Sequence, residues 1–150
     1  MREILFRGKS IQYPNEGKWI YGYYVHNRYP LVDHMEHRIF TGLPDGPRMQ
    51  CIDVDPSTIG QYTGLKDRKG VRIFEGDIIK THYANTPKAD FIEQVVFHNG
   101  RFCGMYERDK MKMWATLPDG IKHLPMDKSV YMEWCEIVGN IHDNPELLEG

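Results

Sequence analysis

The sequence has few cysteines, no long apolar run and almost no excess of charge of either sign. Its three cysteines, Cys51, Cys103 and Cys135, are far apart and odd in number. Their spacing resembles neither a zinc knuckle nor a redox pair, and it predicts no disulfide framework. The cysteines lie in strand-like apolar contexts, where a thiol usually packs in the interior.

No stretch is apolar and uncharged for long enough to cross a bilayer. The opening segment, MREILFRGKS, has charges between its apolar residues and lacks the apolar centre of a signal peptide. We therefore expect a cytoplasmic protein that makes no contact with a membrane.

Charge is nearly balanced, with 19 Lys and Arg residues against 21 Asp and Glu residues, for a formal net charge of -2. This balance excludes a bulk attraction to nucleic acid, which leaves only a local basic surface as a possible contact. Catalytic signatures are missing as well, because neither a Gly-x-Ser-x-Gly elbow nor a phosphate-binding glycine loop is present.

What the sequence does have is aromatic residues, at 12% of 150 positions. Aromatic and β-branched side chains favour strands, and the 14 glycines and nine prolines argue against long helices. Hydrophobic residues at 41% and charged residues at 27% are ordinary for a globular protein. We expect one domain over residues 1–150.

The segment KWIYGYYVHN alternates as a strand does, and both of its faces are apolar or aromatic. We therefore expect a strand that is covered on both sides. Gly22 would let a neighbouring backbone or ring approach closely. One face carries Trp19, Tyr21, Tyr23 and Val25.

Residues 58–80 read TIGQYTGLKDRKGVRIFEGDIIK. They predict strands over residues 61–65 and 71–74, separated by a charged turn, and a third strand that begins after the tight turn at residues 75–77. Gly70 and Gly76 lie where turns often require a positive φ. The glycines therefore indicate a meander of strands.

The strongest local signal is Asn99-Gly100 between two alternating runs, which predicts a two-residue hairpin. Its register would place Phe97 opposite Phe102 and Val96 opposite Cys103. Such an aromatic cross-strand pair contributes about 0.5–1 kcal/mol.

Other segments are less regular. Residues 26–48 predict a long excursion with one short strand near residues 38–41, and residues 107–128 predict a loop with a possible short helical piece. Residues 137–141 predict a strand. A short C-terminal helix would follow, with Asn144 as its N-cap and Pro145 in its first turn. The fold class we expect is mainly β, a small antiparallel, partly open SH3-like barrel or strongly bent sheet with that helix.

Four blocks of the sequence together resemble the YopX protein family. They are REILFRGK, the W-x-Y-G of residues 19–22, VDPSTIGQYTGLKDRKGVRIFEGDII over residues 54–79, and EIVGNIHDNPELL near the end. The resemblance covers about half of the chain. It implies a small, mostly β protein encoded by phages and prophages of bacteria, and it implies no activity and no catalytic residues.

Two groups of residues are candidates for metal ligands. Four carboxylates flank the central block and could offer the oxygen ligands that hard cations prefer, but Asp beside Pro or Gly is typical of turns. His34 and His37 would share a face of a helix, with further ligands from His26, His123 or a cysteine, but their spacing is not that of the protease zinc motif. We assign no metal and no cofactor to either group. The carboxylates are Asp53, Asp55, Glu75 and Asp77.

A basic hairpin tip is the candidate contact for nucleic acid. The residues in question are Lys66, Arg68, Lys69 and Arg72, with Tyr62 and Tyr24 as exposed aromatics that could stack on bases. The alternative is a charged tip that keeps a hairpin edge from aggregating, and neighbouring acidic residues favour it.

A segment rich in Met and Trp is a candidate docking surface, because these side chains adapt well to partners; the alternative is that they cover the end of the barrel. We interpret the protein as non-enzymatic, an accessory protein that acts by binding a host or phage protein or by forming a homo-oligomer. A nucleic-acid-binding module is the alternative. The Met and Trp residues are Met105, Met111, Met113 and Trp114, near Lys110.

Overall fold

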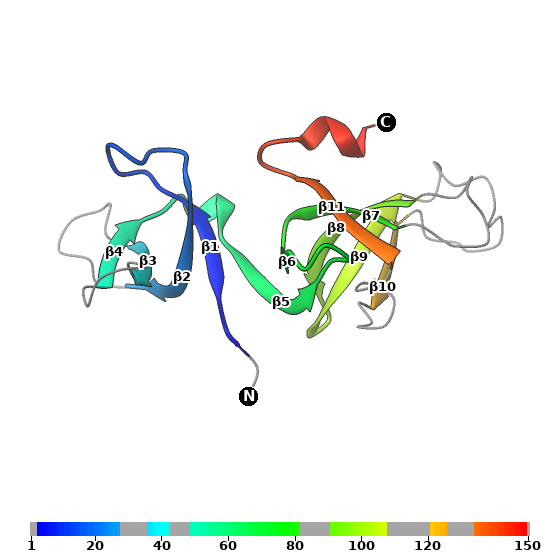
Figure 1. Ribbon diagram of the computed structural model, residues 1–150, viewed down its shortest axis with the longest axis horizontal. Coiled ribbons are helices and arrows are strands. Elements are labelled where there is room, and N and C mark those ends of the chain that lie inside the picture. The colour runs from blue at the N-terminus through cyan, green and yellow to red at the C-terminus, as the bar shows by residue number, and fades with distance from the viewer. Residues whose placement is uncertain are drawn as a thin grey trace. The chain divides into compact units, whose positions relative to one another are not determined.

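The computed structural model describes residues 3–27, 36–42, 49–81, 91–107, 121–125 and 134–149. Side chains are described for these residues except 91, 106, 107 and 121–125. The elements of this part of the chain are strands β1 (Phe6–Lys9), β2 (Trp19–His26), β3 (His37–Gly42), β4 (Met49–Asp53), β5 (Gly60–Lys66), β6 (Arg72–Phe74), β7 (Asp77–Thr81), β8 (Phe91–His98), β9 (Arg101–Glu107), β10 (Ile121–Pro125) and β11 (Cys135–Asn140), and the 3-10 helices η2 (Pro56–Thr58) and η4 (Pro145–Leu148) (Figure 1).

The protein is mainly β, and its strands form two antiparallel sheets. One sheet has the order β4-β3-β2-β1-β5-β6, and the other has the order β10-β9-β8-β7-β11. Neither order closes into a barrel within the described residues. No helix in this part of the chain is both long enough and apolar enough to span a membrane.

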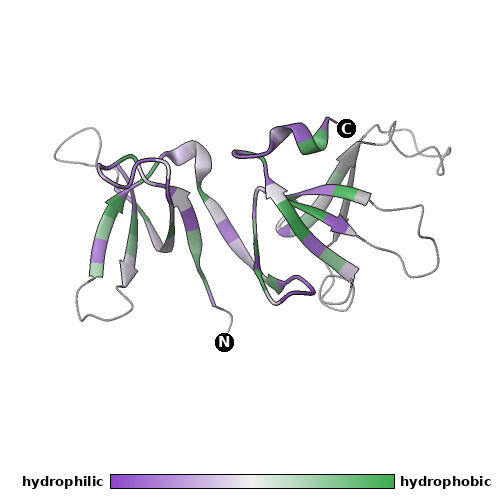
Figure 2. Ribbon diagram, turned by 45° about the horizontal axis from the view of Figure 1, so that its top comes forward, coloured by the Kyte–Doolittle hydropathy of each residue, from purple (hydrophilic) through white to green (hydrophobic). Residues whose placement is uncertain are grey.

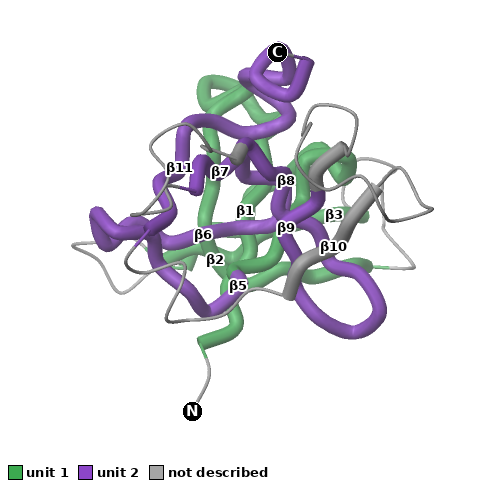
Figure 3. Tube along the Cα trace, turned by 90° about the vertical axis from the view of Figure 1, so that its right-hand side faces the viewer, with its two compact units in different colours: residues 1–62 green, residues 63–150 purple. Residues whose placement is uncertain are grey.

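The chain divides into two compact units, Met1–Tyr62 and Thr63–Gly150 (Figure 3). Strand β5 is the element along which the chain passes from the first unit to the second. The expectation of one domain over residues 1–150 stays a prediction, which a single cooperative unfolding transition would support.

In the first unit, the residues that follow β4 form hydrogen bonds with the end of β1. Ser10, just after β1, forms a β-bridge with Val54, just after β4, and the Asp55 N–H donates to the Lys9 carbonyl at 2.9 Å. The side chains of Ile39 and Val54 are almost fully buried inside the bend that these contacts form. The first unit is therefore a strongly bent ribbon around a small apolar interior.

Gly22 in β2 is required by a close approach of the backbone of β3. A Cβ at this position would lie 2.0 Å from the carbonyl oxygen of Phe40 and 2.9 Å from Cγ2 of Ile39. No side chain fits at 2.0 Å from a backbone atom, so only glycine lets β2 and β3 pair here. The close approach predicted at Gly22 is confirmed.

The second unit packs around a small core. Ile73, Ile79, Val95 and Cys135 are fully buried and come from four different strands, with Leu65 and Ile137 packed against them. Hydrophobic and hydrophilic residues follow one another along these strands, as Figure 2 shows. The alternation is not strict, because the consecutive residues Ile78 and Ile79 of β7 are both fully buried, so both faces of that strand are covered.

The hairpin between β8 and β9 has the predicted turn and register. Asn99 and Gly100 have φ values of 50° and 79°, and Phe97 pairs with Phe102 while Val96 pairs with Cys103. The two phenylalanine rings are 5.1 Å apart in an edge-to-face arrangement. The positive φ values expected at Gly70 and Gly76 are also confirmed.

Several expectations are wrong. Residues 121–125, expected to lie in a loop, form β10, which pairs with β9, and β4 was not anticipated as a strand. Both lie at sheet edges. An edge strand depends on hydrogen bonds to the neighbouring strand more than on a hydrophobic pattern in its own sequence. The C-terminal segment forms a short 3-10 helix, η4, with Asn144 at its N-cap position and Pro145 in its first turn. The Asn144 side chain makes no capping hydrogen bond, so only its predicted capping role is wrong.

Candidate functional site

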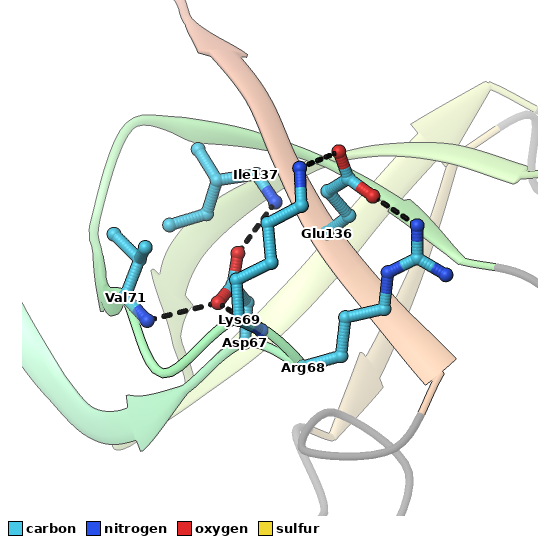
Figure 4. Close-up of polar contacts among 6 residues, drawn as sticks. All are labelled: Asp67, Arg68, Lys69, Val71, Glu136 and Ile137. Atoms are coloured by element: carbon cyan, nitrogen blue, oxygen red, sulfur yellow. Dashed lines mark hydrogen bonds and ion pairs between the residues drawn. The ribbon is translucent and has the colours of Figure 1, made fainter.

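The predicted basic tip is a turn built on a buried acid. Asp67 is 3% exposed, and its Oδ1 atom accepts hydrogen bonds from the backbone N–H groups of Lys69 and Val71, both at 2.9 Å. Its Oδ2 atom accepts a third from the N–H of Ile137 in β11 at 3.2 Å (Figure 4). Asp67 therefore sets the shape of the turn and attaches it to β11.

Two of the four cations at this turn are bound by one carboxylate. Glu136 of β11 forms ion pairs with Arg68 and with Lys69, the latter at 2.5 Å between Nζ and Oε1 (Figure 4). Hydrogen bonds from Lys69 and then Arg68 lower the pKa of the Glu136 carboxyl below its ordinary value. Glu136 thus offsets one of the two positive charges within the second unit.

The remaining predicted nucleic-acid residues are two cations that flank this turn and one tyrosine of β5. Lys66 and Arg72 are exposed, at the end of β5 and the start of β6. Tyr62, expected to be exposed, is 5% exposed, because the alternation of β5 turns its ring inward. The structure therefore presents no Tyr62 ring for stacking beside these cations.

The four carboxylates considered as metal ligands act separately in the structure. Asp53, which is 2% exposed, accepts from Arg38 Nε at 2.6 Å and from Gln12 Nε2 at 2.7 Å. Asp55 caps η2 through the N–H of Ser57. Of the two candidate carboxylates in the first unit, Asp53 thus binds neighbouring side chains and Asp55 binds the backbone of η2.

The two candidate carboxylates of the second unit, Glu75 and Asp77, belong to one turn. Asp77 accepts a hydrogen bond from the backbone N–H of Phe74 at 2.7 Å, which closes the turn at residues 74–77. Glu75 lies within that turn and is partly exposed. The turn chemistry predicted for Asp beside Gly is what Asp77 performs here.

The cysteines are placed as packing residues. Cys103 and Cys135 are fully buried, and Cys51 is partly buried. Burial raises the pKa of the Cys135 thiol to about 11, and it also raises the pKa of Cys51. A thiol is a poor nucleophile when so little of it is ionised near neutral pH, so Cys135 is unsuited to covalent catalysis.

An exposed aromatic surface lies on one face of β2. Tyr21, Tyr23 and Val25 are 45%, 63% and 42% exposed, and they alternate along the strand with residues of the opposite face. We refer to these three residues as the β2 row. The expectation that β2 is covered on both sides is therefore wrong for the described part of the chain.

The neighbours of the β2 row are set by strand register. Arg7 of β1 lies opposite Tyr21, and Phe40 of β3 lies opposite Tyr23. At the start of the strand, the guanidinium of Arg7 lies 4.6 Å from the centre of the Trp19 ring, a cation–π contact. Cationic and aromatic side chains therefore occupy this face of the sheet together.

The sequence contains a signal for this surface that pattern reading did not use. Two of the three residues are tyrosines, whose rings can pack while the hydroxyl group remains in water. A strand buried on both faces would more often carry Ile, Val or Leu at such positions. The tyrosines at 21 and 23 therefore indicate a face that tolerates water.

The motifs quoted above and the antiparallel sheets are consistent with one family. The model of that family, the YopX protein, matches residues 16–149. The chain belongs to the YopX protein family. Among solved structures, this YopX family member is similar to protein EF1440 from Enterococcus faecalis, at 23% sequence identity over 99% of each chain with a TM-score of 0.47. No curated protein matches it.

Some predicted site residues of this YopX family member lie outside the described residues. His34 is one of them, as are Lys110, Met111, Met113 and Trp114 of the predicted docking segment. Met105 is partly buried in β9. His37, in contrast, lies in β3.

Proposed function

We propose that this protein is a phage- or prophage-encoded accessory protein that acts in the bacterial cytoplasm by binding a protein surface, and not by catalysis. The partner we propose is a second copy of the chain. The observation that supports this most is the β2 row, in which Tyr21, Tyr23 and Val25 hold apolar surface in solvent side by side.

Interfaces between proteins are enriched in tyrosine and depleted of charged residues at their centre. The β2 row has this composition, and a two-fold axis would bring the same row of one copy against that of another. The three residues of the row add no charged side chain to such an interface. A homodimer is therefore the simplest assembly that covers this surface.

The roles of the acids and thiols support a non-enzymatic protein. Asp53, Asp67 and Asp77 are buried and engaged in hydrogen bonds that shape turns or neutralise a cation. The raised pKa of Cys135 argues against a nucleophilic role for that thiol.

We also propose that the first unit is a partly open, SH3-like barrel. The bridge between Ser10 and Val54 supports this, because it connects the end of β1 to the end of β4. Backbone nuclear Overhauser contacts between Ser10 and Val54 test the assignment, and their absence in the folded protein contradicts it.

Analytical ultracentrifugation over a range of concentrations tests the self-association. The variant Tyr23→Glu places a charge in the centre of the row, and Val138→Glu places the same charge on an exposed valine of β11, which is 38% exposed. We expect the unmodified chain and Val138→Glu to form dimers and Tyr23→Glu to remain monomeric. A monomeric unmodified chain at every concentration contradicts the homodimer.

A second arm tests binding of a different protein. Immobilised chain is incubated with bacterial lysate treated with nuclease, and the proteins retained are compared with those retained by Tyr23→Glu. If both forms retain the same proteins, the β2 row is not a binding surface.

Nucleic-acid binding through Lys66, Arg68, Lys69 and Arg72 is the alternative function. It has less support, because Glu136 pairs with Arg68 and Lys69 and because Tyr62 is buried. It predicts a complex that weakens steeply between low and high salt in a gel-shift titration. Absence of a complex at low salt contradicts it.

A further inference from the structure

Two histidines face each other across β2 and β3. His26 is the last residue of β2 and pairs in register with His37, the first residue of β3. The N–H of the next residue, Asn27, donates to the Glu36 carbonyl at 2.8 Å, so Asn27 and Glu36 form a hydrogen-bonded pair. His26 and His37 are therefore the neighbouring non-hydrogen-bonded pair. Side chains approach each other most closely at such pairs.

Glu36 adds a carboxylate to the two imidazoles. Its Oε1 atom lies 2.9 Å from Nε2 of His26 and 3.7 Å from Nε2 of His37. One ligand atom from each of the three residues lies within 4.8 Å of the others. Four-coordinate zinc requires ligand atoms about 3.3 Å apart, given bonds near 2.0–2.1 Å. The three ligand atoms are thus already close to the separation an ion needs.

Tyr24 holds one of the imidazoles in place. Its hydroxyl oxygen lies 2.7 Å from Nδ1 of His37. When Nδ1 carries the proton and donates a hydrogen bond to this oxygen, Nε2 of His37 keeps its lone pair and faces Glu36. Histidines that bind metals commonly have such a partner on the other ring nitrogen, which sets the tautomer and orients the ring.

We propose that His26, Glu36 and His37 bind one divalent transition-metal ion of the zinc type. Two imidazoles and one carboxylate suit zinc, cobalt or nickel, whereas calcium and magnesium prefer sets of oxygen ligands. Three protein ligands leave a fourth position for a water molecule. The inference concerns the β2–β3 pair and does not depend on what the β2 row binds.

Rotation of the two rings completes the site. The two imidazoles are stacked with their planes 11° from parallel and their centres 4.7 Å apart, so their lone pairs must turn toward a common point. The side chains are exposed enough to turn, at 42% for His26, 47% for Glu36 and 23% for His37. Binding would replace the hydrogen bond between His26 and Glu36 with bonds from both residues to the ion.

The ion would join the end of β2 to the beginning of β3. An ion that binds only the folded chain raises the free energy of unfolding. The increase grows with the logarithm of one plus the ratio of the free ion concentration to the dissociation constant. Zinc bound at the proposed site would therefore stabilise the pairing of β2 with β3, and it should raise the melting temperature of the chain.

Isothermal titration calorimetry with Zn²⁺ on tag-free, chelator-treated full chain tests the proposal. We expect one Zn²⁺ per chain, with affinity reduced by at least about tenfold in His26→Ala and in His37→Ala. His98→Ala is the matched control, because His98 lies at the end of β8 in the second unit. It should bind zinc as the unmodified chain does, and Mg²⁺ should not compete.

A third variant keeps the test valid if removal of a ring disturbs the strands. Glu36→Gln keeps the size of the side chain and can still contact His26, but it removes the charged ligand. We expect it to melt at the same temperature as the unmodified chain without metal and to show a smaller shift with Zn²⁺. The absorption spectrum of bound Co²⁺ should change in the same variant.

Absence of zinc binding to the unmodified chain overturns the proposal. So does zinc binding that is equal in His26→Ala, His37→Ala and His98→Ala, because the ion would then be held elsewhere. In either case the three side chains form only a hydrogen-bonded cluster that supports the strand pair.

Discussion

The carboxylate of Asp67 accepts a hydrogen bond, 3.2 Å long, from the backbone N–H of Ile137, a residue 70 positions further along the chain. The same carboxylate accepts two more from the turn that it begins. One buried side chain therefore connects the most glycine-rich part of the sequence to β11, the last strand.

Replacement of Asp67 by alanine should destabilise the protein strongly. Three backbone N–H groups would lose a charged acceptor, and we expect the free energy of unfolding to fall by about 3 kcal/mol. Urea denaturation measures this change. The control is Lys69→Ala, which removes only an exposed ion pair and should cost less than about 1 kcal/mol. Equal losses in the two variants would contradict the role given to Asp67.

The ion pairs of Glu136 predict a dependence of stability on pH. Its pKa in the folded protein is lowered by Lys69 and Arg68, so the pairs contribute fully above the ordinary carboxyl pKa of about 4.3. The contribution is lost as the pH falls through the lower, folded value. The difference in unfolding free energy between the unmodified chain and Glu136→Gln should therefore be largest near neutral pH and shrink in acid. Urea midpoints measured from acid to neutral pH test this, and a constant difference would argue against it.

A methyl group at position 22 should disrupt the pairing of β2 with β3. In Gly22→Ala the new Cβ would meet the carbonyl oxygen of Phe40 at 2.0 Å, and a backbone atom cannot rotate away. We expect a loss of about 3 kcal/mol or more, the upper end for overpacked sites. In Gly42→Ala the new Cβ meets nothing within 4 Å, and stability should change little. Thermal melts of both variants compare the two directly, and similar melting temperatures would contradict the close approach.

The cysteines should differ in their reaction with iodoacetamide. With a pKa of about 11, Cys135 is ionised in about one molecule in a thousand at pH 8, and it is also fully buried. Cys51 is partly exposed, so it should be alkylated first in the native protein. Mass spectrometry of digested samples follows each site over time, and all three cysteines should react in urea. Native labelling of Cys135 as fast as Cys51 would show that the last strand opens readily.

The hairpin at Asn99 and Gly100 illustrates what local sequence can predict. A two-residue turn of this type has one favoured geometry, and that geometry sets the register of every pair that follows. The pairing of Phe97 with Phe102 and the burial of Cys103 follow from it, and the structure confirms both. The meander of strands from residue 60 to residue 81 was predicted for the same reason, through its turns.

Edge strands and exposed faces were not predictable in this way. The pattern of β10 is short and ends in Pro125, so its assignment depends on the free edge of β9. The alternation in β2 predicts two faces correctly, but it does not say which face another part of the protein covers. For Tyr62 the same ambiguity led to the wrong expectation, since a ring on a strand is equally compatible with either face.

The candidate sites were only partly visible in the sequence. The basic residues at 66–72 were found, but not the acid Glu136 that pairs with two of them from another strand. His26 was considered as a supporting ligand, but its position opposite His37 became apparent only when β2 and β3 were paired.

By itself, the sequence determined the β class, the membership suggested by its motifs, and the turns at glycine and asparagine. These features depend on interactions between residues close together in the chain, where backbone sterics leave few options. The tertiary structure alone decided the burial of Tyr62, the exposure of Tyr21 and Tyr23, and the meeting of His26 with Glu36 and His37. Such contacts depend on strand order and on which face is covered, and many arrangements of the same strands satisfy the local pattern equally well.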